Sequence, residues 1–112
     1  MQVVSGTFAL GPNGTWTNAT KVVVTGGTLK LENKETFGVG TDMELAASGA
    51  TVALDYDGLM RMNLLYVGDG KMPAGVYGAV GNPAVPAEHQ RSCFTGTGRI
   101  LFGYTGLSVF LR

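Results

Sequence analysis

The chain has 112 residues, with eight Lys plus Arg, eight Asp plus Glu and a formal net charge of zero. Binding to nucleic acid or to anionic membranes needs an excess of basic residues, which a chain of zero net charge lacks, so both classes of partner are disfavoured. A single cysteine excludes an internal disulfide, and no apolar segment approaches the ~20 residues of a membrane-spanning helix. Glycine is the unusual component, because its 18 residues are about twice the ordinary usage and they separate short β-rich runs.

A short phrase recurs three times in the first half of the chain, as Ser-Gly-Thr-Phe-Ala-Leu, Gly-Gly-Thr-Leu-Lys-Leu and Gly-Ala-Thr-Val-Ala-Leu. Its threonines, Thr7, Thr28 and Thr51, are separated by two nearly equal spacings. A Gly-rich repeat of about 20–25 residues with alternating apolar positions is typical of a solenoid, in which each unit stacks on the last. Aligning the copies produces two apolar columns that we expect to form the core: Phe8, Leu29 and Val52 in one, and Leu10, Leu31 and Leu54 in the other.

After Asp55 the pattern changes. A longer apolar run is followed by a turn-rich segment and a short β-rich run, which together predict a β-hairpin whose second strand is short. The apolar run covers residues 59–67, the turn-rich segment 68–75 and the short β-rich run 76–78. A loop at 79–92 and two further strands, at 98–102 and 107–111, complete the predicted order.

The predicted fold is therefore all-β: a short β-solenoid of about three rungs over residues 1–55, closed by a C-terminal hairpin and capping strands over residues 56–112. The two parts are expected to form a single compact domain. An antiparallel β-sandwich is the alternative. Since the chain opens directly in a strand-like run, we expect it to be a fragment of a longer protein.

Two segments of the second half carry a resemblance to known proteins. Residues 65–78 (Leu-Tyr-Val-Gly-Asp-Gly-Lys-Met-Pro-Ala-Gly-Val-Tyr-Gly) and 94–101 (Phe-Thr-Gly-Thr-Gly-Arg-Ile-Leu) resemble the C-terminal ends of secreted bacterial proteins with autotransporter-associated β-strand repeats. Residues 25–31 resemble the repeat unit of the same proteins, although Val76 stands where that pattern has Thr. The resemblance implies a secreted or cell-surface, β-helical structural protein, and it implies no catalytic residues.

Five aromatic side chains are candidates for stacking on sugar rings: Trp16, Tyr56, Tyr66, Tyr77 and Tyr104. If they lie in an exposed row, they favour a carbohydrate-binding module, with glycans as partners. The competing interpretation is that Tyr66 and Tyr77 pack as a cross-strand pair in the hairpin and that Trp16 covers an edge of the solenoid.

Other polar groups offer little chemistry. Cys93 and the single histidine, His89, are four residues apart in the same loop, and a thiol beside an imidazole is a known nucleophile arrangement. No third orienting group or oxyanion site accompanies them, so a structural cysteine is expected. The sequence Asp-Tyr-Asp-Gly at 55–58 has the carboxylates that calcium prefers, but it lacks the pattern of a known calcium loop and predicts a turn. We predict no catalytic residue, metal or cofactor.

The predicted function is thus a non-enzymatic structural or capping module of a secreted bacterial surface protein. Its expected partners are the preceding rungs of a longer parent chain or other copies of itself. An uncovered strand edge near residues 3–10 would allow self-assembly into dimers or fibres.

Overall fold

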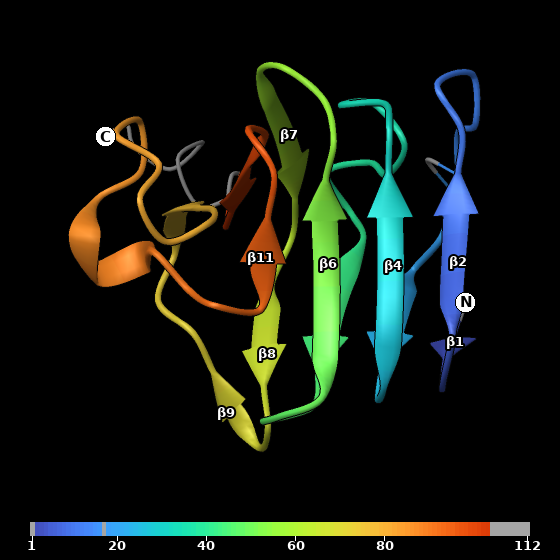
Figure 1. Cartoon of the computed structure of the whole chain (residues 1–112), viewed down its shortest axis with the longest axis horizontal. Helices are drawn as coiled ribbons and strands as arrows, with labels where there is room; N and C mark the ends of the chain where they lie inside the picture. Colours follow the sequence, from blue (N-terminus) through green and yellow to red (C-terminus); the bar gives the residue numbers. More distant parts are fainter. Residues whose placement is uncertain (1, 17, 104–112) are drawn as a thin grey trace.

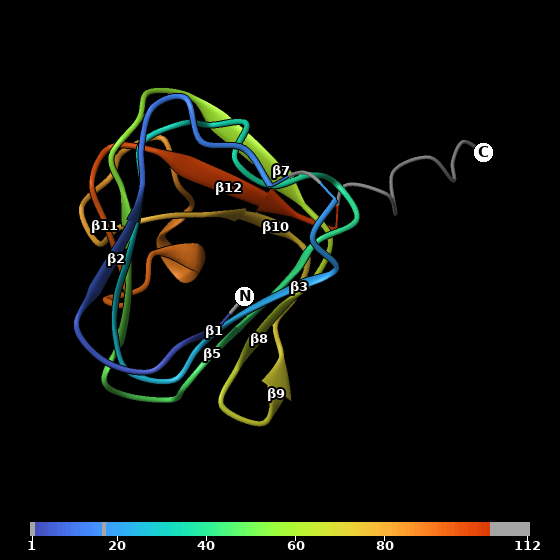
Figure 2. The ribbon, with the colours of Figure 1, turned by 90° about the vertical axis from the view of Figure 1, so that its right-hand side faces the viewer.

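The structure is a computed structural model that describes residues 2–16 and 18–103. Within these residues the chain forms twelve β-strands and one short 3-10 turn, η1 (Ala87–His89), which confirms the all-β prediction (Figure 1). The strands belong to three sheets. Seen end-on, these sheets form three sides around a common interior (Figure 2).

Most neighbouring strands are parallel. The first sheet contains, in spatial order, β1 (Gln2–Val3), β3 (Lys21–Val24), β5 (Asp42–Leu45), β8 (Leu65–Val67) and β9 (Gly70–Lys71), of which only β9 runs antiparallel to its neighbour. The second sheet is wholly parallel and contains β2 (Thr7–Leu10), β4 (Gly27–Leu31), β6 (Ala50–Leu54) and β11 (Phe94–Thr95). In the third sheet β12 (Arg99–Phe102) lies between the parallel β7 (Leu59–Met62) and the antiparallel β10 (Gly75–Tyr77).

The strand register confirms the alignment predicted from the repeat. Phe8 pairs with Leu29 and Leu29 with Val52, while Leu10, Leu31 and Leu54 pair in the same order. Because side chains alternate between the faces of a strand, each column points to one side of its sheet. Leu29 and Val52 are completely buried, as expected for a core.

One member of the first column differs from the prediction. The side chain of Phe8 is 47% exposed, because β2 has a neighbour on one side only and no described strand covers its other side. Within this column, the side chains of Leu29 and Val52 are therefore buried, and that of Phe8 is exposed to solvent. The first aligned position is an edge and not a core position.

The sheets also continue across the predicted boundary at residue 55. Strands β7, β8, β11 and β12 all extend parallel pairings, so much of the second half is built like the first. For β11 and β12, however, the sequence spacing between paired residues is nearly twice that of the earlier pairings, because Val52 pairs with Phe94 and Leu59 with Arg99. The additional chain is the segment between β8 and β11, residues 68–93, which we term the closing segment.

The hairpin predicted over residues 59–78 has a different pairing. Strand β8 turns tightly into β9, where Tyr66 pairs with Lys71, and β10 pairs with β12 instead of β8. The physical reason is the burial of Tyr77, which packs edge-on against Phe102 with ring centroids 5.8 Å apart and donates a hydrogen bond from its hydroxyl to the Pro73 carbonyl at 2.7 Å. The predicted cross-strand pair of Tyr66 and Tyr77 is consequently wrong.

Three smaller differences complete the comparison. The single run predicted at 59–67 is two strands, separated by a corner at which Asn63 donates a hydrogen bond to the Asp42 carboxylate at 2.8 Å. Strand β11 is not among the predicted strands, whereas β12 lies where the strand 98–102 is expected. The loop at 79–92 is confirmed apart from η1, and the strand predicted at 107–111 lies outside the described residues.

Buried polar groups are satisfied across the layers. The completely buried Thr41 donates its hydroxyl to the Ala19 carbonyl at 2.6 Å, which joins residues 22 apart in sequence. In the described part of the chain no buried side-chain nitrogen or oxygen lacks a hydrogen-bond partner. Since an unpaired buried polar group costs about 1–3 kcal/mol, the interior is consistent with a well-specified fold.

Candidate interaction surface at the open end of the sheets

The candidate site is the edge formed by β1 and β2, which we term the open end. Both strands are the last of their sheets, and the described residues place nothing beyond them (Figure 1). The carbonyls of Gly6 and Leu10 accept hydrogen bonds from the amides of Thr28 and Glu32, at 2.8 and 3.2 Å. Because backbone groups alternate in direction along a strand, the N–H and C=O groups of the intervening odd-numbered residues point outward. The open end therefore presents backbone donors and acceptors to an incoming strand.

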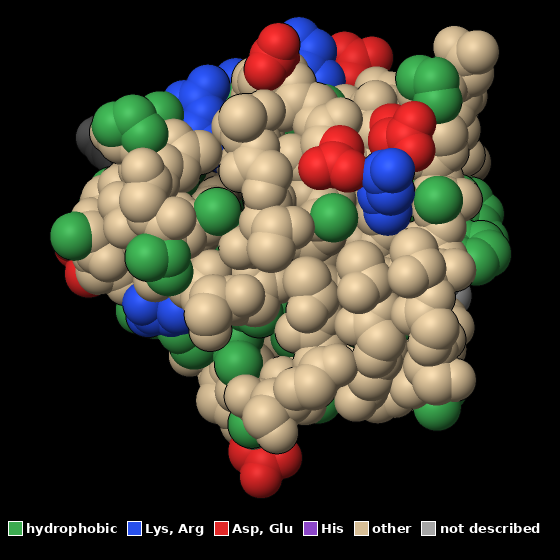
Figure 3. Space-filling view, viewed as in Figure 1, with side chains coloured by type: hydrophobic (Ala, Val, Ile, Leu, Met, Phe, Trp, Pro, Cys, Tyr) green, Lys and Arg blue, Asp and Glu red, His purple; other side chains and the backbone are tan. Residues whose placement is uncertain are grey.

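The side chains at the open end carry no formal charge. Residues 1–20 include no Asp, Glu, Lys, Arg or His, so every such side chain lies from Lys21 onward. Two of the large exposed hydrophobic residues are found here, since Val4 is 63% exposed and Phe8 47%; Trp16, in the connection from β2 to β3, is 44% exposed. In Figure 3 the margin over β2 shows hydrophobic side chains, while the charged ones lie elsewhere on this face. Edge strands are usually protected from pairing by charged side chains or proline, and β2 has neither.

The opposite end of the sheets is covered by the closing segment. Strand β9 pairs along the outer side of β8, and β10 along the outer side of β12. The loop after β10 is held by the imidazole of His89, which stacks on Tyr77 with ring centroids 4.2 Å apart and an interplanar angle of 6°. The side-chain amide of Gln90 donates hydrogen bonds from its Nε2 to the backbone carbonyls of Asn82 and Val85, both at 3.1 Å. The two strand pairings therefore join the closing segment to the last layer, and the contacts of His89 and Gln90 hold the segment together internally.

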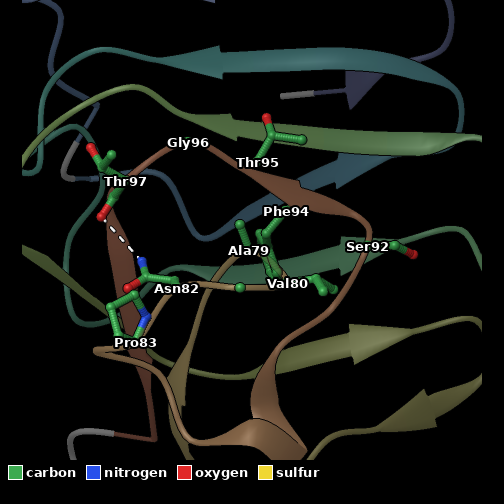
Figure 4. Close-up of a pocket in the computed structure, with 10 residues that line it drawn as sticks. Ala79, Val80, Asn82, Pro83, Ser92, Phe94, Thr95, Gly96 and Thr97 are labelled. Carbon is green, nitrogen blue, oxygen red and sulfur yellow. Dashed lines mark hydrogen bonds between the residues drawn. The ribbon is translucent and has the colours of Figure 1, made fainter.

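A hollow of about 610 Å³ lies between the closing segment and β11 (Figure 4). Its walls are residues 79–83, Ser92 and residues 94–97, and the Asn82 side-chain amide donates to the Thr97 carbonyl across it at 3.3 Å. No Asp, Glu, Lys, Arg, His or Cys is among the residues that line it. The hydroxyl-bearing residues of its lining, Ser92, Thr95 and Thr97, therefore have no titratable side chain among the other lining residues to act as a general base.

The five predicted aromatic residues do not assemble into one surface. Tyr56 and Tyr77 are buried, and Tyr56 donates its hydroxyl to the Arg99 carbonyl at 2.8 Å. Burial raises the pKa of both phenols, because the charged form loses its hydration in the interior. Tyr66 is half-buried on β8, Trp16 is exposed in the connection from β2 to β3, and Tyr104 is outside the described residues. The prediction of exposed stacking rings is therefore wrong for Tyr56 and Tyr77.

The remaining polar candidates are engaged in structural contacts. The imidazole of His89 stacks on Tyr77, and its Nδ1 lies 3.1 Å from the Val76 carbonyl oxygen. Burial raises the pKa of the Cys93 thiol, whereas a nucleophilic cysteine needs a lowered one. Asp57 accepts a hydrogen bond from the Thr97 hydroxyl at 3.4 Å. Residues 2–16 and 18–103 contain no group of three or more His, Cys, Asp and Glu side chains that could hold a metal ion.

A comparison with protein-family models, curated proteins and solved structures finds no match to this chain. The described residues also contain no helix that is long and apolar enough to cross a membrane. The open end coincides with the strand edge near residues 3–10 that the repeat predicts. The absence of any charged side chain from residues 1–20 is a second sequence signal of this edge, which the motifs do not include.

Proposed function

We propose that the chain is a short β-solenoid that acts as a non-enzymatic structural module, closing one end of a stack of β-coils in a secreted bacterial surface protein. The observation that carries this proposal is the difference between its two ends. One end presents unpaired strand edges, and the other is covered by a segment that interrupts the repeat. A module of this shape accepts coils on one side and ends the stack on the other.

The parallel register supports a solenoid over an antiparallel sandwich. Strands β2, β4 and β6 repeat at two nearly equal spacings, given by the pairs Thr7–Thr28 and Thr28–Thr51. Parallel neighbours need a crossover connection, and here each connection passes through the other sides of the molecule before the chain returns (Figure 2). Among the strands of residues 2–16 and 18–103, antiparallel pairing involves only β9 with β8 and β10 with β12, and both β9 and β10 lie in the closing segment.

The proposed location follows from the resemblance of residues 65–78 and 94–101 to the C-terminal ends of secreted bacterial repeat proteins. In the structure these two segments contribute β8 to β10, β11 and most of β12. They therefore include the strands that cover the last layer. A segment that closes a stack is suited to the C-terminal end of a repeat protein, because terminal repeats need a surface unlike that of internal ones.

The proposal is tested by adding one coil to either end. A copy of residues 21–43 joined directly to Gln2 would continue the observed register, since Gln2 pairs with Val23 and Val23 with Glu44. The added coil should bury Phe8 and raise the free energy of unfolding in urea by about 2 kcal/mol, the value of burying one large side chain. The matched control is the same copy joined after Arg112, where no gain is expected.

Circular dichroism should show more β-structure per molecule for the extension at Gln2. An unchanged free energy of unfolding, or an equal gain from the extension at Arg112, would contradict the role of the two ends. Secretion would be examined separately, by expressing the parent chain in its source organism and locating it with an antibody against this module.

A further inference from the structure

We propose that the open end also binds a second copy of this chain, through antiparallel pairing of the two β2 strands about a two-fold axis at Ala9, and that assembly stops at the dimer. This inference rests on the proposed function, because it uses the same uncovered edge. It adds the identity of the partner, the register of pairing and the limit on growth.

The backbone of β2 determines which residues can meet. The Gly6 and Leu10 carbonyls accept hydrogen bonds from β4 and the residue directly after it. Because backbone groups alternate in direction, Thr7 and Ala9 direct their N–H and C=O groups outward. In an antiparallel pair, two residues that both point toward the partner can exchange two hydrogen bonds. A two-fold axis at Ala9 places Ala9 opposite Ala9 of the second copy, and Thr7 opposite Gly11. Both pairs are then of the hydrogen-bonded type.

The side chains select this register over its neighbours. Shifting the pairing by one residue would place core-facing side chains of one copy against outward-facing side chains of the other. With the axis at Ala9, Phe8 of each copy lies directly opposite Leu10 of the other, on the face that continues the core column. The register thus covers Phe8, which is the residue that the single chain leaves most clearly unburied in that column.

Charge does not oppose the association. No charged side chain is present in residues 1–20, so the two edges meet without like-charge repulsion. Lys30 and Glu32 lie one strand further in, on β4 and directly after it, and they form an ion pair at 3.7 Å within their own chain. The edge therefore has the composition of a strand that pairs and lacks the charges that prevent pairing.

Growth beyond the dimer requires a second free edge, and the last strands at the closed end, β9, β10 and β11, are only two or three residues long. The outer sides of β8 and β12 are occupied by β9 and β10. Strand β11 is only two residues long, and the loop at 79–83 lines a hollow with it. When two open ends pair with each other about a two-fold axis, both are covered and assembly stops at the dimer. Head-to-tail stacking of an open end on a closed end would instead produce fibres.

The experiment combines light scattering with cross-linking. The mass of the unmodified chain should rise from one to two chains between 1 µM and 1 mM protein and then remain constant. For cross-linking, Ala9→Cys is made in a Cys93→Ala background, because Cys93 is the chain's only cysteine. In the proposed pair the two substituted Cα atoms are about 5.5 Å apart, within the range that a disulfide bridges. Mild oxidation should therefore convert most of the protein to a disulfide dimer.

Thr7→Cys in the same background is the matched control. It lies on the same exposed face of β2 as Ala9, but the two copies of residue 7 would be separated by about 14 Å, too far for a disulfide. We expect at least a tenfold lower yield of dimer for Thr7→Cys than for Ala9→Cys. A chain that remains monomeric at 1 mM, one that grows past the dimer, or equal cross-linking of the two variants would each overturn the proposal. Since a monomeric chain could still gain stability from an added coil at Gln2, failure here is distinguishable from failure of the proposed function.

Discussion

The open end and the closed end are made from the same kinds of strand, but they treat equivalent residues differently. Phe8 at the open end and Leu29 one layer further in occupy the same column, yet Phe8 is half exposed and Leu29 is completely buried. At the closed end Tyr77 is completely buried, because His89 of the closing segment and Phe102 of β12 pack against it. Position along the stack, and not residue type alone, therefore decides how much a side chain stabilises the fold.

The largest expected difference between the layers comes from shortening one member of the column. Leu29→Ala should lower the free energy of unfolding by about 3–5 kcal/mol, because it leaves a cavity between two layers. Phe8→Ala should cost only about 1 kcal/mol, since the ring already contacts water on one side. Urea denaturation at micromolar protein, where β2 is unpaired, measures both values. Equal losses would mean that the layers are not stacked as described.

A pair of glycines extends the comparison to the backbone. Gly6 and Gly27 precede aligned threonines and have φ of +72° and +75°, a conformation that costs other residues about 1–2 kcal/mol. A Cβ atom added at Gly6 would meet open space, whereas one at Gly27 would overlap the Gly6 carbonyl. We therefore expect Gly6→Ala to cost about 1–2 kcal/mol. Gly27→Ala should cost about 2–5 kcal/mol, because overpacking adds to the strain.

Thermal melting of the two glycine variants, followed by circular dichroism, provides the measurement. Gly49→Ala is a useful control, since Gly49 also has a positive φ, of +83°, and has open space around it. It should behave like Gly6→Ala. If Gly6→Ala were as damaging as Gly27→Ala, the open end would have to be covered in solution.

The pairing of the strands was predictable only where the repeat is regular. The recurring Gly and Thr phrases determine the register of β2, β4 and β6, because two nearly equal spacings leave little choice of alignment. The pairing of β11 with β6, in the next layer, could not be predicted for two reasons. Phe94 pairs with Val52 at nearly twice the usual spacing, and β11 has no Gly-Thr phrase before it. The pairing of the hairpin could not be predicted, because the position of Tyr77 depends on Phe102, which is remote in sequence.

The candidate surface was only partly visible in the sequence. The repeat predicts a strand edge near residues 3–10. The sequence does not show that the opposite end of the sheets is covered, and this contrast makes the edge a candidate interaction surface. The aromatic residues could not be sorted by type, since Trp16 and Tyr56 look equally suitable in sequence and only Tyr56 is buried. Burial of that ring depends on the Arg99 carbonyl, which is 43 residues away.

The two ends should also respond differently to alkali. Residues 1–20 contain no Tyr, Cys or His, whereas Tyr56 and Tyr77 are buried at or near the closed end. Burial raises the pKa of Tyr56 above its unfolded value of about 10, so the protonated phenol is favoured in the folded state. Its contribution is fully present below pH 10, and each further pH unit should lower the free energy of unfolding by about 1.4 kcal/mol for this one group.

The variant Tyr56→Phe tests this assignment. At pH 7 it should cost about 1 kcal/mol, because the hydrogen bond to the Arg99 carbonyl is lost. Above pH 10 its stability should fall less steeply than that of the unmodified chain. Urea midpoints measured from pH 8 to pH 11.5 give both numbers. Parallel pH curves for the two proteins would show that Tyr56 is not the group that titrates.

The smallest expected effect concerns the thiol of Cys93. Its burial raises the pKa, so alkylation by iodoacetamide at pH 8 should be at least about tenfold slower in the folded chain than in 8 M urea. Mass spectrometry of quenched samples measures the rate. Fast alkylation of the folded chain would indicate that the closing segment opens readily, and it would weaken the contrast between the two ends.

The most direct test of the central claim is amide hydrogen exchange, followed residue by residue by NMR at a protein concentration where the chain is monomeric. Strand β4 lies between β2 and β6, so all of its amides face a neighbouring strand and should exchange slowly. In β2 the account predicts alternation, with slow exchange at Phe8 and Leu10 and fast exchange at Thr7 and Ala9. Uniform protection of β2, or alternation within β4, would contradict the stacked register with one open end.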